Sequence, residues 1–297
     1  MLTIDPKAIA TKDLHQFMLG AVAPRPIAFV STISKDGVLN LAPYSFFNAF
    51  SSNPPIVIFS SNRKVADNTT KDTLKNVQDT GEVVINVVSH KIVRQMAVTS
   101  VEYGPEVSEF VKGGFTPLES ELVKPFRVAE SPVQMECTVD QILPLGEDGG
   151  AGNLIVCRIV RMHIAEEILT DAGRIDPHKI DLMGRMGKFY YARASGAAVE
   201  EIVQVVNKIA IGFDGLPDSI RHSKILTGNN LGQLAGLLAL PGAEEASAAI
   251  AKDDRAVQIL SKSGFESDMH RYIKEVLDAG NEELGAALAV VCDLKGR

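Results

Sequence analysis

The sequence predicts a mainly β domain, a closed or partly open antiparallel barrel with flanking helices, followed by a C-terminal α-helical extension. Short strand-like segments fill most of the first two thirds of the chain, and few of the helices that a parallel βαβ sheet requires lie between them. After about Ala197 the chain becomes rich in Ala and Leu with helical periodicity. We therefore divide it into a barrel domain, residues 1–196, and a mostly helical extension, residues 197–297.

The first strands are indicated by local composition and turn signals. A short helix over residues 11–19 precedes a strand over 27–33, which is rich in β-branched and aromatic residues. Asp36-Gly37 is a strong hairpin turn signal after it. A third strand, 56–59, is bounded by Pro54-Pro55 and Ser60-Ser61. Between them, residues 40–48 are expected to form an irregular elbow, because Pro43 interrupts the strand pattern and a polar and aromatic run follows it. This elbow could form a wall for a flat ligand.

The next segments alternate helices and strands. Residues 71–80 predict a helix with Asp72 as N-cap and Gly81 as its stop, before a strand over 82–88. A helix over 89–98 and a mobile acidic stretch over 102–114 follow. Two long β-rich runs, 132–145 and 153–166, are joined by the glycine-rich residues 146–152, which predicts an antiparallel hairpin. These glycines fail the GxGxxG spacing and lie between two strands, so they indicate a turn and not a phosphate loop.

The extension contains four segments with helical periodicity, over residues 230–240, 243–261, 268–279 and 282–291. The run TGNN at 227–230 is most simply a turn and helix N-cap.

Composition excludes several classes of function. The chain has 297 residues with 30 basic and 37 acidic side chains, so its formal charge is −7 and no basic field is available for nucleic acid or an anionic membrane. No apolar run reaches the roughly 18 residues of a membrane span, and no signal-peptide pattern opens the chain. We expect a cytoplasmic protein with neither partner. Three widely spaced cysteines, expected to be reduced and buried, and six histidines without metal-binding spacing predict no metal site.

One group of residues could bind a phosphate. Hydroxyls and cations gather after the third strand and at the start of the following helix, where free N–H groups and the helix dipole favour an anion. The group comprises Ser60, Ser61, Arg63, Lys64, Lys71, Asp72 and Thr73. The alternative is that the cations are solvated surface residues and Thr73 only caps its helix.

Several segments in this order resemble the flavin reductase-like family with an FMN-binding split barrel, which includes flavoredoxin and ferric reductase relatives. They are PRPIAFVST from Pro24, NLAPYSFF from Asn40, the third strand ending in SSNRK, KDTLKNVQDTGEVVINVV from Lys71, and RMGKFYYAR from Arg185. The resemblance covers about residues 14–193 and implies an antiparallel, Greek-key-like split β-barrel.

The resemblance also implies a cofactor site. It places the FMN phosphate at the KDT segment and the loop before it, and Arg185 and Tyr190 in a segment that closes over the flavin. The alternative for that segment is a strand that only closes the barrel. The flavin ring would lie against Thr32, Asn40, Ala42, Pro43, Ser45 and Phe46. For Phe46, packing in a core or interface is an alternative, and TGNN could cover a neighbour's flavin.

Two functions remain open. The first is an FMN-dependent reductase that takes hydride from NAD(P)H at flavin N5 and passes electrons to free flavin, ferric iron or another small-molecule acceptor. The second is a flavoredoxin-like electron carrier without efficient NAD(P)H oxidation. The resemblance implies a homodimer in either case. No catalytic acid, base or nucleophile is assigned from the sequence.

Overall fold

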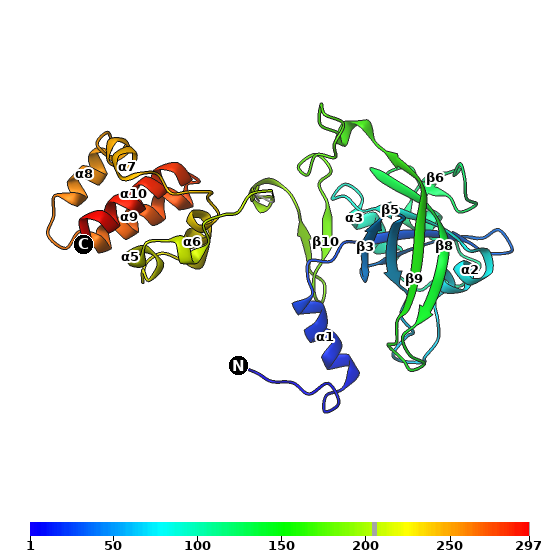
Figure 1. Cartoon of the computed structure of the whole chain (residues 1–297). Coiled ribbons are helices and arrows are strands. Elements are labelled where there is room, and N and C mark those ends of the chain that lie inside the picture. The colour runs from blue at the N-terminus through cyan, green and yellow to red at the C-terminus, as the bar shows by residue number, and fades with distance from the viewer. Residues whose placement is uncertain (204–206, 297) are drawn as a thin grey trace. The chain divides into compact units, whose positions relative to one another are not determined.

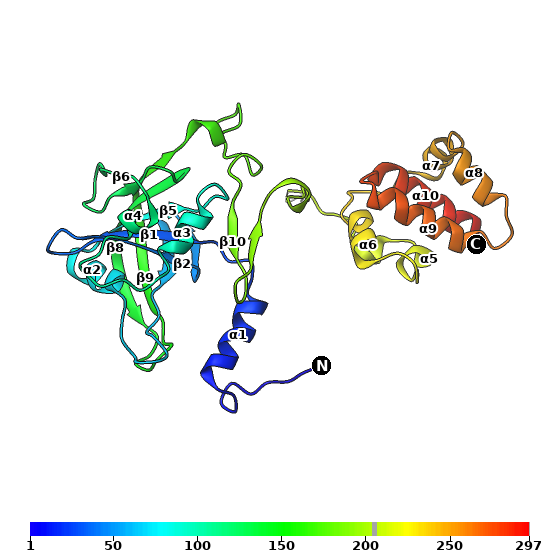
Figure 2. The same ribbon diagram turned by 180° about the vertical axis from the view of Figure 1, so that it is seen from behind.

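The structure is a computed structural model that describes residues 1–203 and 207–296. The chain divides into two compact units, residues 1–200 and 201–297. The first holds the strands and the second is helical (Figures 1 and 2).

The first unit is built on one seven-stranded antiparallel sheet with the order β2-β1-β5-β8-β9-β4-β3. Its strands are β1 (Ala28–Ile33), β2 (Leu39–Tyr44), β3 (Phe47–Ser52), β4 (Pro55–Ser60), β5 (Glu82–Val87), β8 (Val133–Pro144) and β9 (Asn153–Ile164). The two edge strands, β2 and β3, follow each other in the chain, and no ladder joins them among the described residues. Of the closed or partly open barrel predicted from the sequence, the closed form is therefore corrected, whereas the predicted antiparallel sheet with flanking helices is confirmed.

The hairpin at Asp36-Gly37 forms as predicted, with Gly37 at φ +83° and Thr32 opposite Asn40. The predicted irregular elbow is mostly wrong. β2 runs through Pro43 to Tyr44, and β3 begins at Phe47. A proline is tolerated because β2 is an edge strand, on which alternate N–H groups need no partner in the sheet.

The long hairpin of β8 and β9 also forms as predicted (Figure 1). Short pairs complete the strands: β6 (Pro117–Leu118) with β7 (Arg127–Val128), and β10 (Met183–Arg185) with β11 (Tyr191–Arg193). The helices of this unit are α1 (Thr11–Ala21), α2 (Asp72–Thr80), α3 (Val93–Val98) and α4 (Glu109–Gly113), with short 3-10 helices at Glu166–Ile168 and Gly196–Ala198.

Helix boundaries correct three expectations. Lys71, not Asp72, is the N-cap of α2, although Gly81 ends the helix at φ +67° as predicted. The helix predicted over 89–98 begins only at Val93. The stretch predicted to be a mobile lobe contains α4, whose Glu109 and Phe110 are buried. The apolar side chain of Phe110 packs into the core and fixes α4, whereas residues 102–108 lie outside any helix or strand.

Side chains alternate between two apolar cores, as the pleat of a strand requires. Val30 of β1 lies in a core with Leu74 of α2, whereas its neighbour Phe29 packs with Met96 of α3 and Phe110 of α4. Cys137 and Cys157 are buried free thiols in the first of these cores, as predicted. Helix α2 is thus fixed to the sheet through an apolar face, which holds its N-terminus beside β2.

The second unit has its own core, formed by residues such as Leu234, Met269, Ile273 and Leu288. Its helices are α5 (Asp218–Arg221), α6 (Gly228–Ala235), α7 (Ala243–Ile250), α8 (Asp254–Leu260), α9 (Glu266–Asp278) and α10 (Glu282–Gly296), after a 3-10 turn at Phe213–Gly215. Thr227 caps α6 in a capping box, as the TGNN run predicted. The single helix predicted over 243–261 is wrong, because the Asp253 side chain accepts a hydrogen bond from the Ala256 N–H and starts a new helix.

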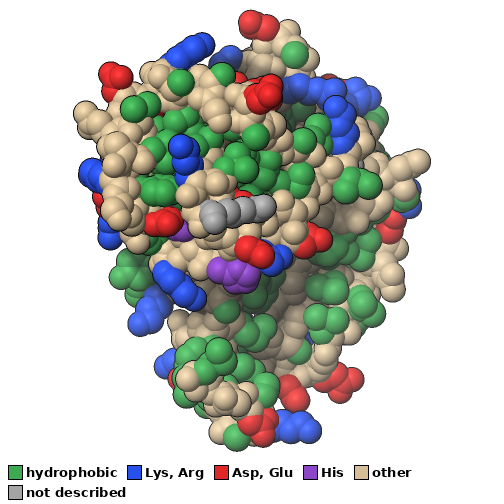
Figure 3. All heavy atoms as spheres, turned by 60° about the vertical axis from the view of Figure 1, so that its left-hand side comes forward, with side chains coloured by type: hydrophobic (Ala, Val, Ile, Leu, Met, Phe, Trp, Pro, Cys, Tyr) green, Lys and Arg blue, Asp and Glu red, His purple; other side chains and the backbone are tan. Residues whose placement is uncertain are grey.

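Within the described residues, none of the helices combines the length and apolar character that crossing a membrane demands. Acidic, basic and apolar side chains are interspersed on the face shown in Figure 3.

Candidate ligand-binding site

A cavity of about 290 Å³ lies between β2, the start of α2 and the segment before α4. We call it the lysine cavity, after Lys64 and Lys71. Its lining is Asn40, Ala42, Pro43, Lys64, Thr70, Lys71, Asp72, Thr73, Thr99, Ser100, Val101, Glu102, Tyr103, Pro105 and Glu109. Seven of the residues predicted to bind the cofactor are among them: Asn40, Ala42, Pro43, Lys64, Lys71, Asp72 and Thr73.

A buried hydrogen-bond network forms one side of the cavity. The Asn40 Oδ1 accepts from the hydroxyls of Thr73, at 2.7 Å, and Thr32, at 3.1 Å. The Thr32 hydroxyl accepts in turn from the Asn76 amide at 3.0 Å. Because Thr32 and Asn40 face each other across the hairpin, strand register sets this geometry. The network fixes the side chains of β1, β2 and α2 relative to one another.

Glu109 completes the network and was missed from the sequence. Its Oε2 accepts from the Asn40 amide at 3.1 Å and from the Leu41 backbone N–H at 3.0 Å. Burial raises the pKa of Glu109, and these two hydrogen bonds oppose the rise. In the sequence Glu109 stands in the same acidic stretch as Glu102 and Glu106, and no local pattern distinguishes the buried carboxylate from the exposed ones.

The cavity carries positive charge at Lys64 and Lys71. The Lys71 ammonium lies 5.2 Å from the centroid of the Tyr44 ring, and burial lowers the pKa of Lys71 while the charge of Glu102 raises it. Lys64 forms an ion pair with Glu102 at 2.8 Å. Burial also raises the pKa of Tyr44 to about 12, so this phenol stays neutral. The first N–H groups of α2, which no intrahelical carbonyl accepts, lie at the same end of the cavity.

The other predicted phosphate residues do not line this cavity. The Ser60 hydroxyl donates to Asn62 Oδ1 at 2.8 Å, and Ser61 is buried beside Asn153, with which it exchanges backbone hydrogen bonds. Arg63 donates to the side chain and the carbonyl of Asn68, at 2.6 and 2.7 Å. Its guanidinium is thus held by its own turn.

Ser45 and Phe46 link the two edge strands and lie beside Arg25 instead of in the lysine cavity. The Ser45 hydroxyl accepts from Arg25 Nε at 3.4 Å, and the Phe46 ring centroid lies 5.9 Å from the guanidinium. The His15 ring of α1 meets Phe46 edge-on at 6.1 Å.

Arg185 and Tyr190 belong to the hairpin of β10 and β11. Arg185 donates to the Tyr190 carbonyl at 3.1 Å and lies over the Tyr191 ring, while the side chain of Tyr190 is 71% exposed. Arg185 exchanges backbone hydrogen bonds with Arg25. This hairpin therefore stands beside Arg25, and neither Arg185 nor Tyr190 lines the lysine cavity.

Arg25 was not identified from the sequence as a site residue, yet its side chain contacts α1, the Ser45-Phe46 link and the β10–β11 hairpin. It is 5% exposed and donates to the carbonyls of Leu19, at 2.8 Å, Val22, at 2.5 Å, and Met186, at 3.2 Å. Burial and the charge of Arg185 lower the pKa of Arg25. Its contacts fix α1 and the β10–β11 hairpin around the Ser45-Phe46 link. In the sequence, the PRP motif that contains Arg25 is the feature that could have indicated this role.

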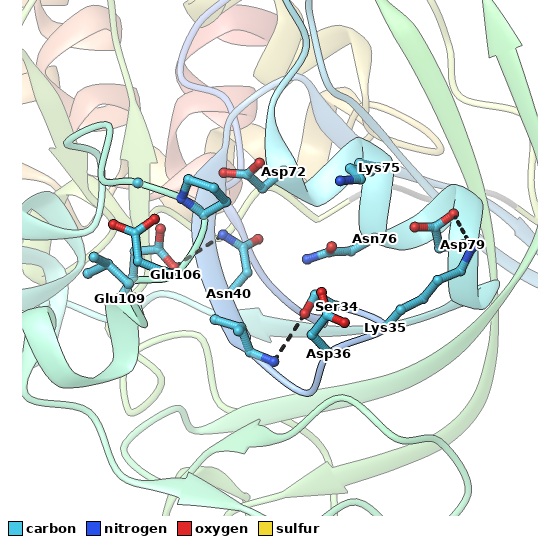
Figure 4. Close-up of a pocket in the computed structure, with 14 residues that line it drawn as sticks. Ser34, Lys35, Asp36, Asn40, Asp72, Lys75, Asn76, Asp79, Glu106 and Glu109 are labelled. Atoms are coloured by element: carbon cyan, nitrogen blue, oxygen red, sulfur yellow. Dashed lines mark hydrogen bonds and ion pairs between the residues drawn. The ribbon is translucent and has the colours of Figure 1, made fainter.

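A second cavity, of about 620 Å³, adjoins the first and shares Asn40, Asp72, Pro105 and Glu109 with it (Figure 4). Five acidic side chains outnumber Lys35 and Lys75 there, and Lys35 is paired with Asp79 at 3.0 Å. The acids are Asp36, Asp72, Asp79, Glu106 and Glu109. We call it the acidic cavity. The lysine cavity has only three acids against its two lysines, so its charge is less negative and an anion fits it better.

Among the residues with described positions, no three His, Cys, Asp or Glu side chains are grouped to hold a metal ion.

Comparison with known proteins gives consistent matches over the first unit. Residues 19–178 match the family described as flavin reductase like domain. An uncharacterized protein of Aquifex aeolicus is 42% identical over 184 residues, which cover 62% of this chain and 91% of that protein.

Solved structures are similar over the same region. Nitrilotriacetate monooxygenase component B from Bacillus cereus is 35% identical, with a TM-score of 0.63 over 69% of this chain and 98% of that one. The 2-nitrobenzoate 2-nitroreductase NbaA of Pseudomonas fluorescens is 26% identical, with a TM-score of 0.61 over the same shares of the two chains.

Proposed function

Because the chain belongs to the flavin reductase-like family of split-barrel proteins, we propose that it binds FMN and acts as an NAD(P)H-dependent reductase. Free flavin, ferric iron or another small molecule would accept the electrons. The lysine cavity is the observation that carries the proposal, because it combines two lysines, a threonine hydroxyl and a helix N-terminus at one place.

These residues suit a terminal phosphate. Lys71 and Lys64 would supply charge, and Thr73 and the first N–H groups of α2 would supply hydrogen bonds. In this structure the Thr73 hydroxyl donates its only proton to Asn40 Oδ1, so binding of the phosphate would require this proton to turn from Asn40 to a phosphate oxygen. Ala42 and Pro43 give β2 a small, flat surface against which the flavin could extend. The chemistry that FMN would supply is hydride acceptance and donation at N5.

The named relatives support a role in reduction. One carries the name of a nitroreductase and the other that of a component of a monooxygenase. The alternative from another functional class is a flavoredoxin-like carrier, which would hold FMN and exchange electrons with a protein partner without oxidising NAD(P)H efficiently.

Anaerobic mixing of the FMN-loaded protein with NADH or NADPH distinguishes a reductase from an electron carrier. We expect the flavin absorbance near 450 nm to bleach within seconds, since median enzyme turnover is about 10 s⁻¹. Dithionite serves as the control, because it reduces the flavin in either case. A protein bleached by dithionite but by neither nicotinamide would be a carrier.

We further propose that the protein is a homodimer. An apolar groove of about 500 Å³ runs over the first unit between the sheet and the β10–β11 hairpin. It is lined mainly by Ile27, Phe47, Val133, Met135, Met162, Ile180, Leu182 and Met183. Light scattering should give about twice the 31.9 kDa of one chain. A monomer that still holds FMN would contradict this assembly.

A further inference from the structure

The lysine cavity contains a carboxylate that is paired with one of its two lysines. Glu102 Oε2 lies 2.8 Å from Lys64 Nζ, and both side chains line the cavity beside Lys71 and Thr73. The chain thus contributes a negative group at the place where the proposed function puts a phosphate.

Three carboxylates line this cavity, but their roles differ. Glu109 is committed to Asn40 and the Leu41 N–H, and Asp72 stands in the first turn of α2. Only Glu102, among the described residues, joins a lysine of the cavity in an ion pair. Burial lowers the pKa of Lys71, and the charge of Glu102 opposes this lowering.

The ion pair between Lys64 and Glu102 lies where it can separate easily. The Glu102 side chain is 63% exposed and stands in the segment between α3 and α4, outside any helix or strand. Exposed ion pairs of this kind contribute little to stability, because water and salt screen them and two long side chains lose freedom. A phosphate with two negative charges can therefore compete for Lys64.

We propose that Glu102 is a displaceable substitute for the ligand's phosphate. Its carboxylate holds Lys64 while the cavity contains no anion, and it leaves when the phosphate binds. This inference rests on the proposed function, because it assumes that FMN places its phosphate in the lysine cavity. Glu102 therefore lowers the affinity for FMN, and it leaves the affinity for riboflavin, which has no phosphate, unchanged.

The test compares Glu102→Gln with the wild-type protein in parallel titrations with FMN and riboflavin, followed by flavin fluorescence. Glutamine keeps the shape and removes the charge. We expect FMN to bind about three- to tenfold more tightly to the variant at low salt, with a smaller gain in 0.5 M KCl, where the screening length falls to a few ångströms. Riboflavin affinity should stay within about twofold.

Two variants control for other effects. Glu106→Gln removes the same charge from the same segment, but Glu106 lines only the acidic cavity, so FMN affinity should change by less than about twofold. In a Lys64→Met background, Glu102→Gln should lose most of its gain, because the competition is for Lys64.

The outcomes distinguish a failure of the inference about Glu102 from a failure of the proposed phosphate site. If the wild type prefers FMN over riboflavin but Glu102→Gln leaves FMN affinity unchanged or weaker, the inference about Glu102 is wrong and the phosphate site stands. If Glu106→Gln gives the same gain, the effect is one of net charge and the inference is also wrong. If the wild type binds FMN and riboflavin equally, the phosphate site itself fails, and the inference fails with it.

Discussion

Replacing both Lys71 and Thr73 with alanine is expected to weaken FMN binding by about 100-fold or more. Each charge-assisted hydrogen bond to a phosphate contributes about 1.5–3 kcal/mol, and the double variant removes one cation and one hydroxyl. Lys71 is half-buried against Tyr44, so solvent screens its charge less than that of a free surface lysine. Riboflavin affinity should change little, because riboflavin lacks the phosphate. Parallel fluorescence titrations with the two flavins measure both effects.

Lys75→Ala is the matched control for this variant. Lys75 lies one turn further along α2 and faces the acidic cavity, so the variant removes the same charge from the same helix without touching the lysine cavity. FMN affinity should stay within about threefold. An equal loss in Lys75→Ala, or unchanged FMN affinity in the double variant, would show that the phosphate does not lie at the start of α2.

Replacing Asn40 with alanine is expected to lower the free energy of unfolding by about 2–4 kcal/mol. The substitution removes the shared acceptor of the Thr32 and Thr73 hydroxyls and the donor to Glu109, and a buried polar group left without a partner costs about 1–3 kcal/mol. Because the Glu109 carboxylate, which lines the same cavity, loses the amide that binds it, FMN affinity should also fall. Urea unfolding measures the first effect and fluorescence titration the second.

Asn48→Ala is the control for Asn40. Asn48 is exposed on β3, and within the described part of the chain its side chain accepts only from the neighbouring Ala49 N–H. Its replacement should change the unfolding free energy by less than about 0.5 kcal/mol. If the two variants were equally stable, the network around Asn40 would contribute nothing measurable to the fold.

Local signals were sufficient for the hairpins and for several helix ends. Asp36-Gly37 set the first hairpin, Gly81 ended α2, and Thr227 began α6, because each acts through the backbone within a few residues. The path of β2 was missed because a proline breaks an inner strand but not an edge strand, and the position of a strand in a sheet depends on distant partners. Asp253 was likewise not distinguished as an N-cap within an Ala-rich helical run.

Within the candidate site, too, residues with near neighbours in the sequence could be predicted, whereas residues with distant partners could not. That Lys71 and Thr73 lie together could be predicted because they are two positions apart at the start of one helix, and the family resemblance proposed them for a phosphate. Glu109 could not, because its partners Asn40 and Leu41 are nearly seventy residues away in the chain. Arg63 is a basic residue near the expected site, but Asn68 holds its side chain in a turn that the sequence does not reveal.

A crystal structure of the protein with FMN bound is the most direct test of the central claim, that the lysine cavity binds the flavin phosphate. The account predicts phosphate oxygens within hydrogen-bond distance of the Lys71 ammonium and the Thr73 hydroxyl, with the flavin extending along Ala42 and Pro43. A phosphate bound at Arg63 or in the acidic cavity, with Lys71 and Thr73 free of it, would contradict the claim.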